Sequence, residues 1–234
     1  MDKGKYVKKY WLIIVALIPF LILTVFYFYT KEAREDLSTM KYPRKMYPVG
    51  IDTVNLGAGK YRVDSVYYAI NNFNFVNQYN QEITKEVLHD KIIVANFFSV
   101  NNTTVSPKIS QQLARIQSEM IRDDRVVLLS FTTEPLTDSI SVLKQYAQQY
   151  GAIPGKWHFL NGSEEQIVNL ANDELKLAKQ MKKSLESSED IINAKQLILL
   201  DPNWNIRGYY DGSSENKVNI LMGDILLLQK EFKR

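Results

Sequence analysis

The sequence contains no cysteine among its 234 residues and only two histidines, His89 and His158. A chain without cysteine has no disulfide bond, no thiolate metal ligand and no nucleophilic thiol. Thiol–disulfide exchange is therefore excluded, because it requires an attacking thiolate. Lipoprotein-type lipidation is excluded for the same reason, since it needs a cysteine.

Long runs of one charge are also absent beyond the N-terminus. The 29 basic and 26 acidic residues are mixed along the chain and give a formal net charge of +3. A nucleic-acid-binding face needs clustered basic residues, so we expect no nucleic-acid partner. With 45% hydrophobic and 12% aromatic residues, the composition is ordinary for a folded protein.

One long uncharged segment is present, WLIIVALIPFLILTVFYFY at residues 11–29. Its length is close to the roughly 20 residues that a helix needs to cross the hydrocarbon core. Four lysines precede the segment, whereas basic and acidic residues are mixed after it. The positive-inside rule therefore predicts that residues 1–10 are cytoplasmic and that the chain after residue 30 lies on the outer, periplasmic side. A cleaved signal peptide is the alternative, but its apolar region is usually shorter, about 7–15 residues. We expect a single-pass protein of the cytoplasmic membrane.

Residues 30–63 are polar, contain Pro43 and Pro48, and predict a tether that leads to one domain at residues 64–234. In that domain short apolar runs alternate with amphipathic stretches, which is typical of α/β proteins. The run IIVANFF at residues 92–98 predicts a central strand that is buried on both faces. The other expected elements are a helix from Ser106, strands at 125–132 and 157–160, helices at 139–150 and 164–175, a polar insert at 176–190, a hairpin of 197–200 with 206–210, and a helix at 215–232.

This order predicts a thioredoxin-type fold, in which a central mixed sheet is flanked by helices. The loop after the central strand is the usual active site of such folds, because a helix N-terminus stabilises negative charge there. In this chain the loop reads SVNNTTVSP, residues 99–107. We expect Ser106 to cap the next helix and Pro107 to occupy its first position. Asp138 is the expected cap of the helix at 139–150.

The loop ending in Ser-Pro, the sequence WHF at 157–159 and the sequence IRGYYDG at 206–212 together resemble the Sco/SenC family of copper-binding proteins, which take part in assembling the CuA centre of cytochrome c oxidase. The resemblance covers roughly residues 64–232. It implies copper ligands in a Cys-x-x-x-Cys-Pro loop and a histidine before the hairpin. The matching positions here are Asn102, Ser106 and Asn193, so all three ligands are missing from this divergent relative. Copper(I) prefers thiolate, thioether and imidazole donors, and we expect neither copper nor another cofactor.

Our interpretation is a non-catalytic accessory or scaffold factor in respiratory oxidase assembly. Besides the membrane, the expected partner is an oxidase subunit or a ligand-bearing Sco-like protein. The candidate partner surface consists of Asn102, Ser106, Pro107, Asn193, Arg207 and Asp211; Arg207 and Asp211 have the alternative role of pairing or satisfying the turn. A second hypothesis is copper binding or sensing through a rearranged site of His158, methionines and carboxylates.

We do not expect an enzyme. Ser106 has no predicted base within reach, and a helix cap is the simpler role for it. The carboxylates Glu134 and Asp138 suggest acid/base chemistry, but their segment is predicted to be a strand-to-helix loop. His89 is expected in a turn and His158 in a strand, where each reads as structural.

Overall fold

The computed structural model describes residues 43–57, 60–71, 73–182, 185 and 187–233, together with positions 18, 19 and 24. By internal contacts the chain divides into two units, Met1–Lys41 and Tyr42–Arg234. The predicted membrane segment, residues 11–29, lies outside the described residues except at those three positions. Within the described part, no helix has the length and apolar character needed to cross a membrane.

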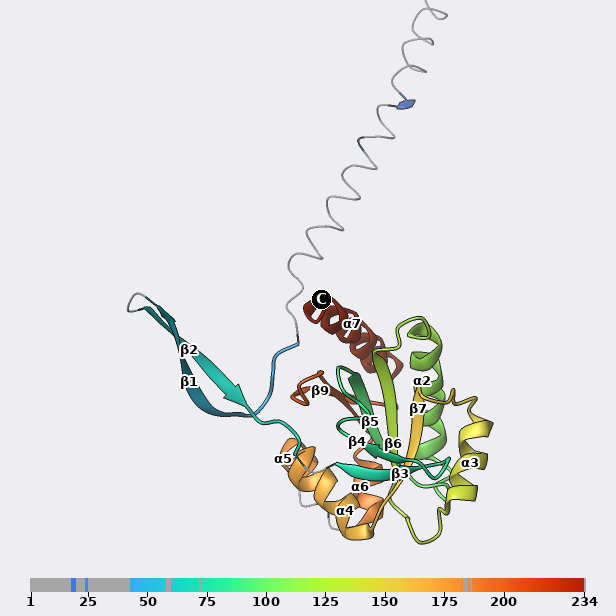
Figure 1. Ribbon diagram of the computed structural model, residues 1–234. Coiled ribbons are helices and arrows are strands. Elements are labelled where there is room, and N and C mark those ends of the chain that lie inside the picture. The colour runs from blue at the N-terminus through green and yellow to red at the C-terminus, as the bar shows by residue number, and fades with distance from the viewer. Residues whose placement is uncertain are drawn as a thin grey trace, which may run out of the picture. The chain divides into compact units, whose positions relative to one another are not determined.

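The second unit is built on a mixed sheet whose strand order is β4-β3-β7-β6-β5-β8-β9 (Figure 1). Strands β5, β6 and β7 run parallel, β3 and β8 pair antiparallel with β7 and β5, and the outer strands β4 and β9 pair antiparallel with β3 and β8. The predicted central strand is confirmed: β5 is buried at every position and lies between β6 and β8. The strands are β3 (Asn74–Asn77), β4 (Glu82–Thr84), β5 (Ile92–Phe98), β6 (Val126–Thr132), β7 (Trp157–Asn161), β8 (Gln196–Leu200) and β9 (Ile206–Asp211).

Helices cover both faces of the sheet, which explains why its middle strands are continuously apolar. On one face, α2 (Val105–Glu119), α3 (Ile140–Gln149) and α7 (Glu215–Glu231) bury residues such as Leu113, Leu143 and Leu221 against the sheet. On the other, α4 (Glu164–Asn169), the π-helical turn η1 (Leu170–Glu174), α5 (Leu177–Met181) and α6 (Ser188–Asn193) pack around an aromatic cluster that includes Phe131 and Trp204. Figure 1 shows the sheet between these two groups of helices. The fold class predicted from sequence is therefore confirmed for this unit.

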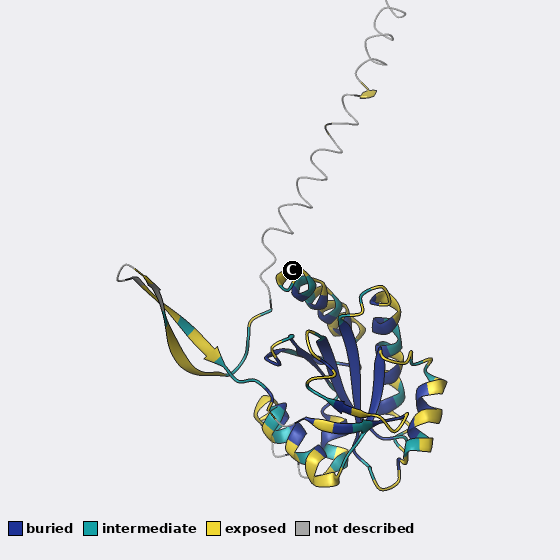
Figure 2. Ribbon diagram, viewed as in Figure 1, coloured by how far each residue is buried: buried dark blue, intermediate teal, exposed yellow. Residues whose placement is uncertain are grey.

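The predicted tether contains an element that the sequence did not reveal. Strands β1 (Pro48–Gly57) and β2 (Lys60–Tyr67) form an antiparallel hairpin of their own. Figure 2 shows this ribbon largely in the exposed colour, apart from the sheet, and Ile51 and Val63 are 75% and 64% exposed. The prolines of this stretch suggested an irregular tether, but Pro48 stands at the start of an edge strand, where proline is tolerated.

The predicted polar insert at 176–190 is less solvated than its charge suggested. Leu177 and Leu185 are buried in the core, and the Lys176 ammonium lies 4.1 Å from the centre of the Tyr68 ring. The insert therefore anchors itself to the domain through its few apolar residues.

Candidate functional site

The loop between β5 and α2 lies at the end of the sheet where the parallel strands β5, β6 and β7 terminate. Thr133 N, just beyond β6, donates to the carbonyl of Phe98 at 2.8 Å, which places the two strand ends side by side. In an open α/β sheet this end is where binding sites usually form. The β5–α2 loop, which the sequence analysis singled out, therefore lies at the end of the sheet where a binding site is expected. Its side chains differ from the copper ligands that the family resemblance implies.

Asn102 occupies the first position that the resemblance matches to a copper ligand. Its Oδ1 accepts hydrogen bonds from the backbone N–H groups of Thr104, Val105 and Ser106, at 3.2, 2.8 and 3.0 Å. The helix begins at Val105, so the Asn102 carboxamide satisfies donors that the first turn of α2 leaves without intrahelical partners. The acceptor at this helix start is thus Asn102, and the expectation that Ser106 caps the helix is wrong.

Ser106, at the second ligand position, is fully buried within the first turn of α2. Its Oγ accepts a hydrogen bond from the backbone N–H of Ser99 at 3.1 Å, so the hydroxyl closes the loop onto the end of β5. Pro107 is the third helical residue, not the first as expected, and still lies in the turn where proline is tolerated.

Asp138 lies beneath this loop and is 1% exposed. Its Oδ2 accepts from Val100 N at 3.2 Å and from the Thr132 hydroxyl. The predicted cap is wrong, since the N-cap of α3 is Ser139. Burial raises the pKa of the Asp138 carboxyl, although its hydrogen bonds act in the opposite direction. Asp138 is thus a structural bridge between two loops, and Glu134 accepts from the Asn101 amide at 2.7 Å on the surface above it.

Asn193 and Asp211 lie at the same end of the sheet. Asn193 is the last residue of α6 and is exposed. Asp211 pairs with Gln196 at the start of β8, and β8 runs antiparallel to β5, so this pair is near the end of β5. The Asp211 carboxylate accepts from the backbone N–H and the hydroxyl of Ser213, at 2.8 and 2.6 Å. Asn193 and Asp211, both predicted for the partner surface, therefore lie at the end of the sheet where the β5–α2 loop lies.

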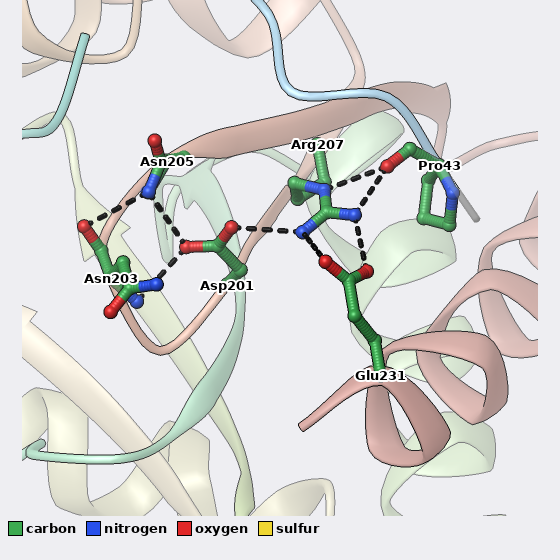
Figure 3. Close-up of polar contacts among 6 residues, drawn as sticks. All are labelled: Pro43, Asp201, Asn203, Asn205, Arg207 and Glu231. Carbon is green, nitrogen blue, oxygen red and sulfur yellow. Dashed lines mark hydrogen bonds and ion pairs between the residues drawn. The ribbon is translucent and has the colours of Figure 1, made fainter. Parts of the chain in front are cut away.

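Arg207 does not lie at this end of the sheet. Ile206 pairs with Leu200 at the opposite end of β8 and β9, and the Arg207 side chain is only 3% exposed. Its guanidinium binds Asp201 at 2.9 Å, Glu231 at 2.6 Å and the carbonyl oxygen of Pro43 at 2.8 Å (Figure 3). Arg207 pairs with these groups and not with Asp211, so the alternative structural role is the one that the geometry supports.

The two histidines do not approach the loop. His89 is in the turn before β5, as expected, and is exposed. His158 is the second residue of β7, at the end opposite the loop, and its Nδ1 lies 3.2 Å from the Asn77 amide nitrogen. Burial lowers the pKa of His158, while a hydrogen bond to the Gly155 backbone acts to raise it.

The donor set does not fit the family's metal. The Asn102 and Ser106 oxygens already accept hydrogen bonds from the loop backbone, and amide and hydroxyl oxygens are poor copper(I) ligands. Among the residues that the structure describes, no group of three His, Cys, Asp or Glu side chains could hold a metal ion. Of the described methionines, Met46 packs against the core cluster on one face of the sheet, and Met120 and Met222 belong to the cluster on the other face.

One surface residue of this end was missed by sequence reasoning. Leu136, in the β6–α3 loop, is 91% exposed, and the neighbouring Pro135 carbonyl is held by the Asn161 amide at 3.2 Å. Leu136 has the highest exposed fraction of the large apolar side chains that the structure describes. In the sequence, Leu136 is an isolated leucine within the mainly polar segment TTEPLTDS. Periodicity alone does not show whether such a leucine is exposed or lies in the core.

The fold and the loop define a thioredoxin-like domain whose loop after the central strand carries no cysteine. A sequence model of the SCO1/SenC family matches residues 64–223, more than half of the chain, and the chain belongs to this family. The SCO1 protein homolog of Bacillus subtilis (strain 168) is 25% identical over 164 residues, covering 69% of this chain and 83% of that protein.

Two solved structures share the fold. A SCO1/SenC family lipoprotein from Bacillus anthracis str. Ames superposes with a TM-score of 0.57 and 23% identity, covering 69% of this chain and 95% of that one. BsSco, a member of the Sco family of cytochrome c oxidase assembly proteins in which a disulfide switch has been identified, superposes with a TM-score of 0.58 and 21% identity, covering 70% and 94%.

Proposed function

We propose that this chain is a metal-free, non-catalytic family member that acts by binding another protein during cytochrome c oxidase assembly. The observation that carries the proposal is the hydrogen bonding of the β5–α2 loop. Asn102 and Ser106 hold this loop closed by accepting hydrogen bonds from its own backbone. A loop that keeps its shape without a metal or a thiol can serve as a binding surface, but it supplies neither of these groups for a reaction. BsSco, which has the same fold, belongs to a family of oxidase assembly proteins, and this supports oxidase assembly as the process.

The proposed partner surface is the sheet end that carries Leu136, Asn193 and Asp211, together with the partly exposed Asn102 and Pro107. Leu136 supplies an apolar anchor, and the surrounding amides and carboxylate supply a polar rim, which is the usual composition of a transient interface. The occupant that we propose is an oxidase subunit or a Sco-like protein with intact ligands. Residues 11–29 form the proposed anchor in the cytoplasmic membrane, with the domain on its outer side.

The test is affinity purification of the tagged full-length chain from detergent-solubilised membranes, followed by identification of what co-purifies. We expect an oxidase subunit or a cysteine-bearing relative, with recovery reduced about ten-fold by Leu136→Asp, since loss of a central apolar anchor costs about 1–2 kcal/mol. The matched control is Val87→Asp, because Val87 is 55% exposed in the turn before β5, at the other end of the sheet. Recovery of neither class of partner, or equal losses in both variants, would refute the proposed surface.

The metal-free part is tested separately, by titrating the purified chain with copper(I) and copper(II) against a competing chelator of known affinity. We expect no stoichiometric binding. Tight one-to-one binding would overturn it and direct mutagenesis to His158 and the methionines.

A further inference from the structure

We infer that a groove along strand β3 binds an extended, positively charged segment of a partner polypeptide. Two adjoining depressions form this edge groove, with volumes of about 480 and 400 Å³, and Asn74, Phe75 and Gln166 line both. One depression continues towards η1 and the other towards the end of β7. The groove is thus elongated, as an extended chain requires.

The main chain of β3 is open along part of this groove. β3 pairs with β4 over Asn74, Phe75 and Val76, but with β7 only at Val76 and Asn77. Asn77 N donates to the carbonyl of Gln81 at 2.9 Å on the β4 side, and peptide groups alternate between the two sides of a strand. The Asn74 peptide therefore faces the β7 side, where β7 has already ended and the described residues supply no strand partner. An added extended segment can pair with such a peptide group.

The side chains of the groove suit a polypeptide main chain. Asn71, Asn74, Asn80 and Asn169 line it and are exposed. A carboxamide has both donors and an acceptor, which is the combination that peptide groups need on their two sides, and Asn74 Nδ2 already donates to Glu82 Oε1 at 2.5 Å. The groove therefore provides hydrogen-bonding partners without demanding one particular side chain.

The carboxylates that line the groove and the apolar residue at its base indicate which side chains the bound segment carries. Glu82, Asp173 and Glu174 line the groove, and among the residues that the structure describes no lysine or arginine does. Glu174 is fixed by the Tyr68 hydroxyl at 2.6 Å and by Asn71 N at 2.9 Å, while Asp173 is exposed. Phe75, which is 4% exposed, lies at the base. A carboxylate rim above an apolar base accommodates the charged end and the aliphatic stem of lysine or arginine.

Two lysines of neighbouring segments have partners outside the rim carboxylates. The Lys85 ammonium donates to the Ile70 carbonyl at 2.6 Å, and the Lys176 ammonium lies over the Tyr68 ring. Three carboxylates thus line the groove, and charge complementarity favours a basic segment. This inference does not rest on the proposed function, because it uses none of the loop residues.

The experiment measures fluorescence anisotropy with the full-length chain in detergent. The probes are fluorescein-labelled extended peptides of one design, carrying lysine, glutamine or glutamate at the same positions. We expect the lysine peptide to bind at least about ten-fold more tightly than the glutamate peptide, with an advantage that shrinks at high salt. Equal binding of the three peptides, or no binding of the lysine peptide, would overturn the inference.

Three variants locate the binding. Asp173→Lys should weaken the lysine peptide about five- to ten-fold, since it converts an attraction into a repulsion, whereas Glu119→Lys makes the same charge change at an exposed position on α2 and should leave binding unaltered. Asn169→Trp keeps the charge but fills the groove, and should weaken the lysine and glutamine peptides alike. Thermal unfolding of each variant checks its folding. Loss of binding in Glu119→Lys equal to that in Asp173→Lys would mean that only the overall charge matters, and this too would overturn the inference.

Discussion

Replacing Arg207 by methionine is expected to be one of the most destabilising single changes in the domain. The Arg207 and Asp201 side chains are 3% and 0% exposed, and Glu231 is 28% exposed. Burial acts to lower the pKa of the Arg207 guanidinium, but the hydrogen bonds and charges of Glu231 and Asp201 outweigh it and raise that pKa. Removal of the cation would leave the Asp201 carboxylate buried without a counter-charge.

The magnitude follows from that burial. Removing one member of a buried ion pair costs roughly 3–5 kcal/mol, mainly because the remaining charge is left uncompensated. Asp201 keeps three donors, namely Asn203 N, Asn205 N and the Asn205 amide, at 2.9, 3.0 and 3.0 Å, so we expect the lower part of this range. For a domain of this size, about 3 kcal/mol corresponds to a fall in Tm of roughly 6–12 °C.

The assay is urea unfolding of the full-length chain in detergent, followed by tryptophan fluorescence, because Trp204 lies in the turn that Asp201 organises. The matched control is Arg62→Met. Arg62 contacts Asp64 at 2.7 Å, but the two side chains are 62% and 42% exposed, so the change should cost less than about 1 kcal/mol. If both substitutions cost the same, or if Arg207→Met costs less than about 1 kcal/mol, the reasoning from burial is wrong.

Four further predictions concern single residues. Asn102→Ala should cost about 1–2 kcal/mol in thermal unfolding, because three N–H groups at the start of α2 lose their acceptor, and Asn102→Asp should recover most of this. Ser106→Cys, in a chain with no other thiol, should react far more slowly with a thiol reagent than Ser213→Cys, since position 106 is buried and position 213 is exposed. Burial raises the pKa of Asp138 above 3.8, so its contribution to stability is present below pH 3.8 and lost as pH rises through the raised value; Asp138→Asn should therefore gain stability relative to the natural chain on going from acid to neutral pH in unfolding experiments. Burial lowers the pKa of His158 below 6.5, so its contribution is present above pH 6.5 and lost as pH falls through the lowered value; His158→Gln should unfold with a weaker acid dependence below pH 6.5.

Local patterns predicted the framework of the domain because its strands and helices obey short-range rules. The apolar run of β5 and the spacing of α7 depend only on neighbouring residues, and both elements formed where they were expected. The candidate loop was also located correctly, since it follows from the order of strand and helix.

The wrong predictions concern residues whose environment is set by contacts with distant segments of the chain. Asp138 and Ser139 are both good cap residues, and only the bond from Val100 N, 38 positions away, shows that the first is buried beneath the loop. Arg207 is 24 positions from Glu231 and 164 from Pro43, so its burial was invisible to any local rule. The hairpin of β1 and β2 was missed because proline and glycine were read as loop signals, whereas pairing between the strands supplies the missing order.

The loop keeps its shape through hydrogen bonds of its own side chains. The first turn of a helix always presents N–H groups that need acceptors, and this requirement persists whether or not a metal is bound nearby. Here Asn102 meets it with a neutral amide oxygen, and Ser106 holds the end of β5 against the helix. The substitutions at these positions are therefore not empty places in an unused site, because each forms hydrogen bonds that keep the loop closed. A loop that is closed in this way holds a fixed shape without a metal, and this is the property that the proposed binding function requires.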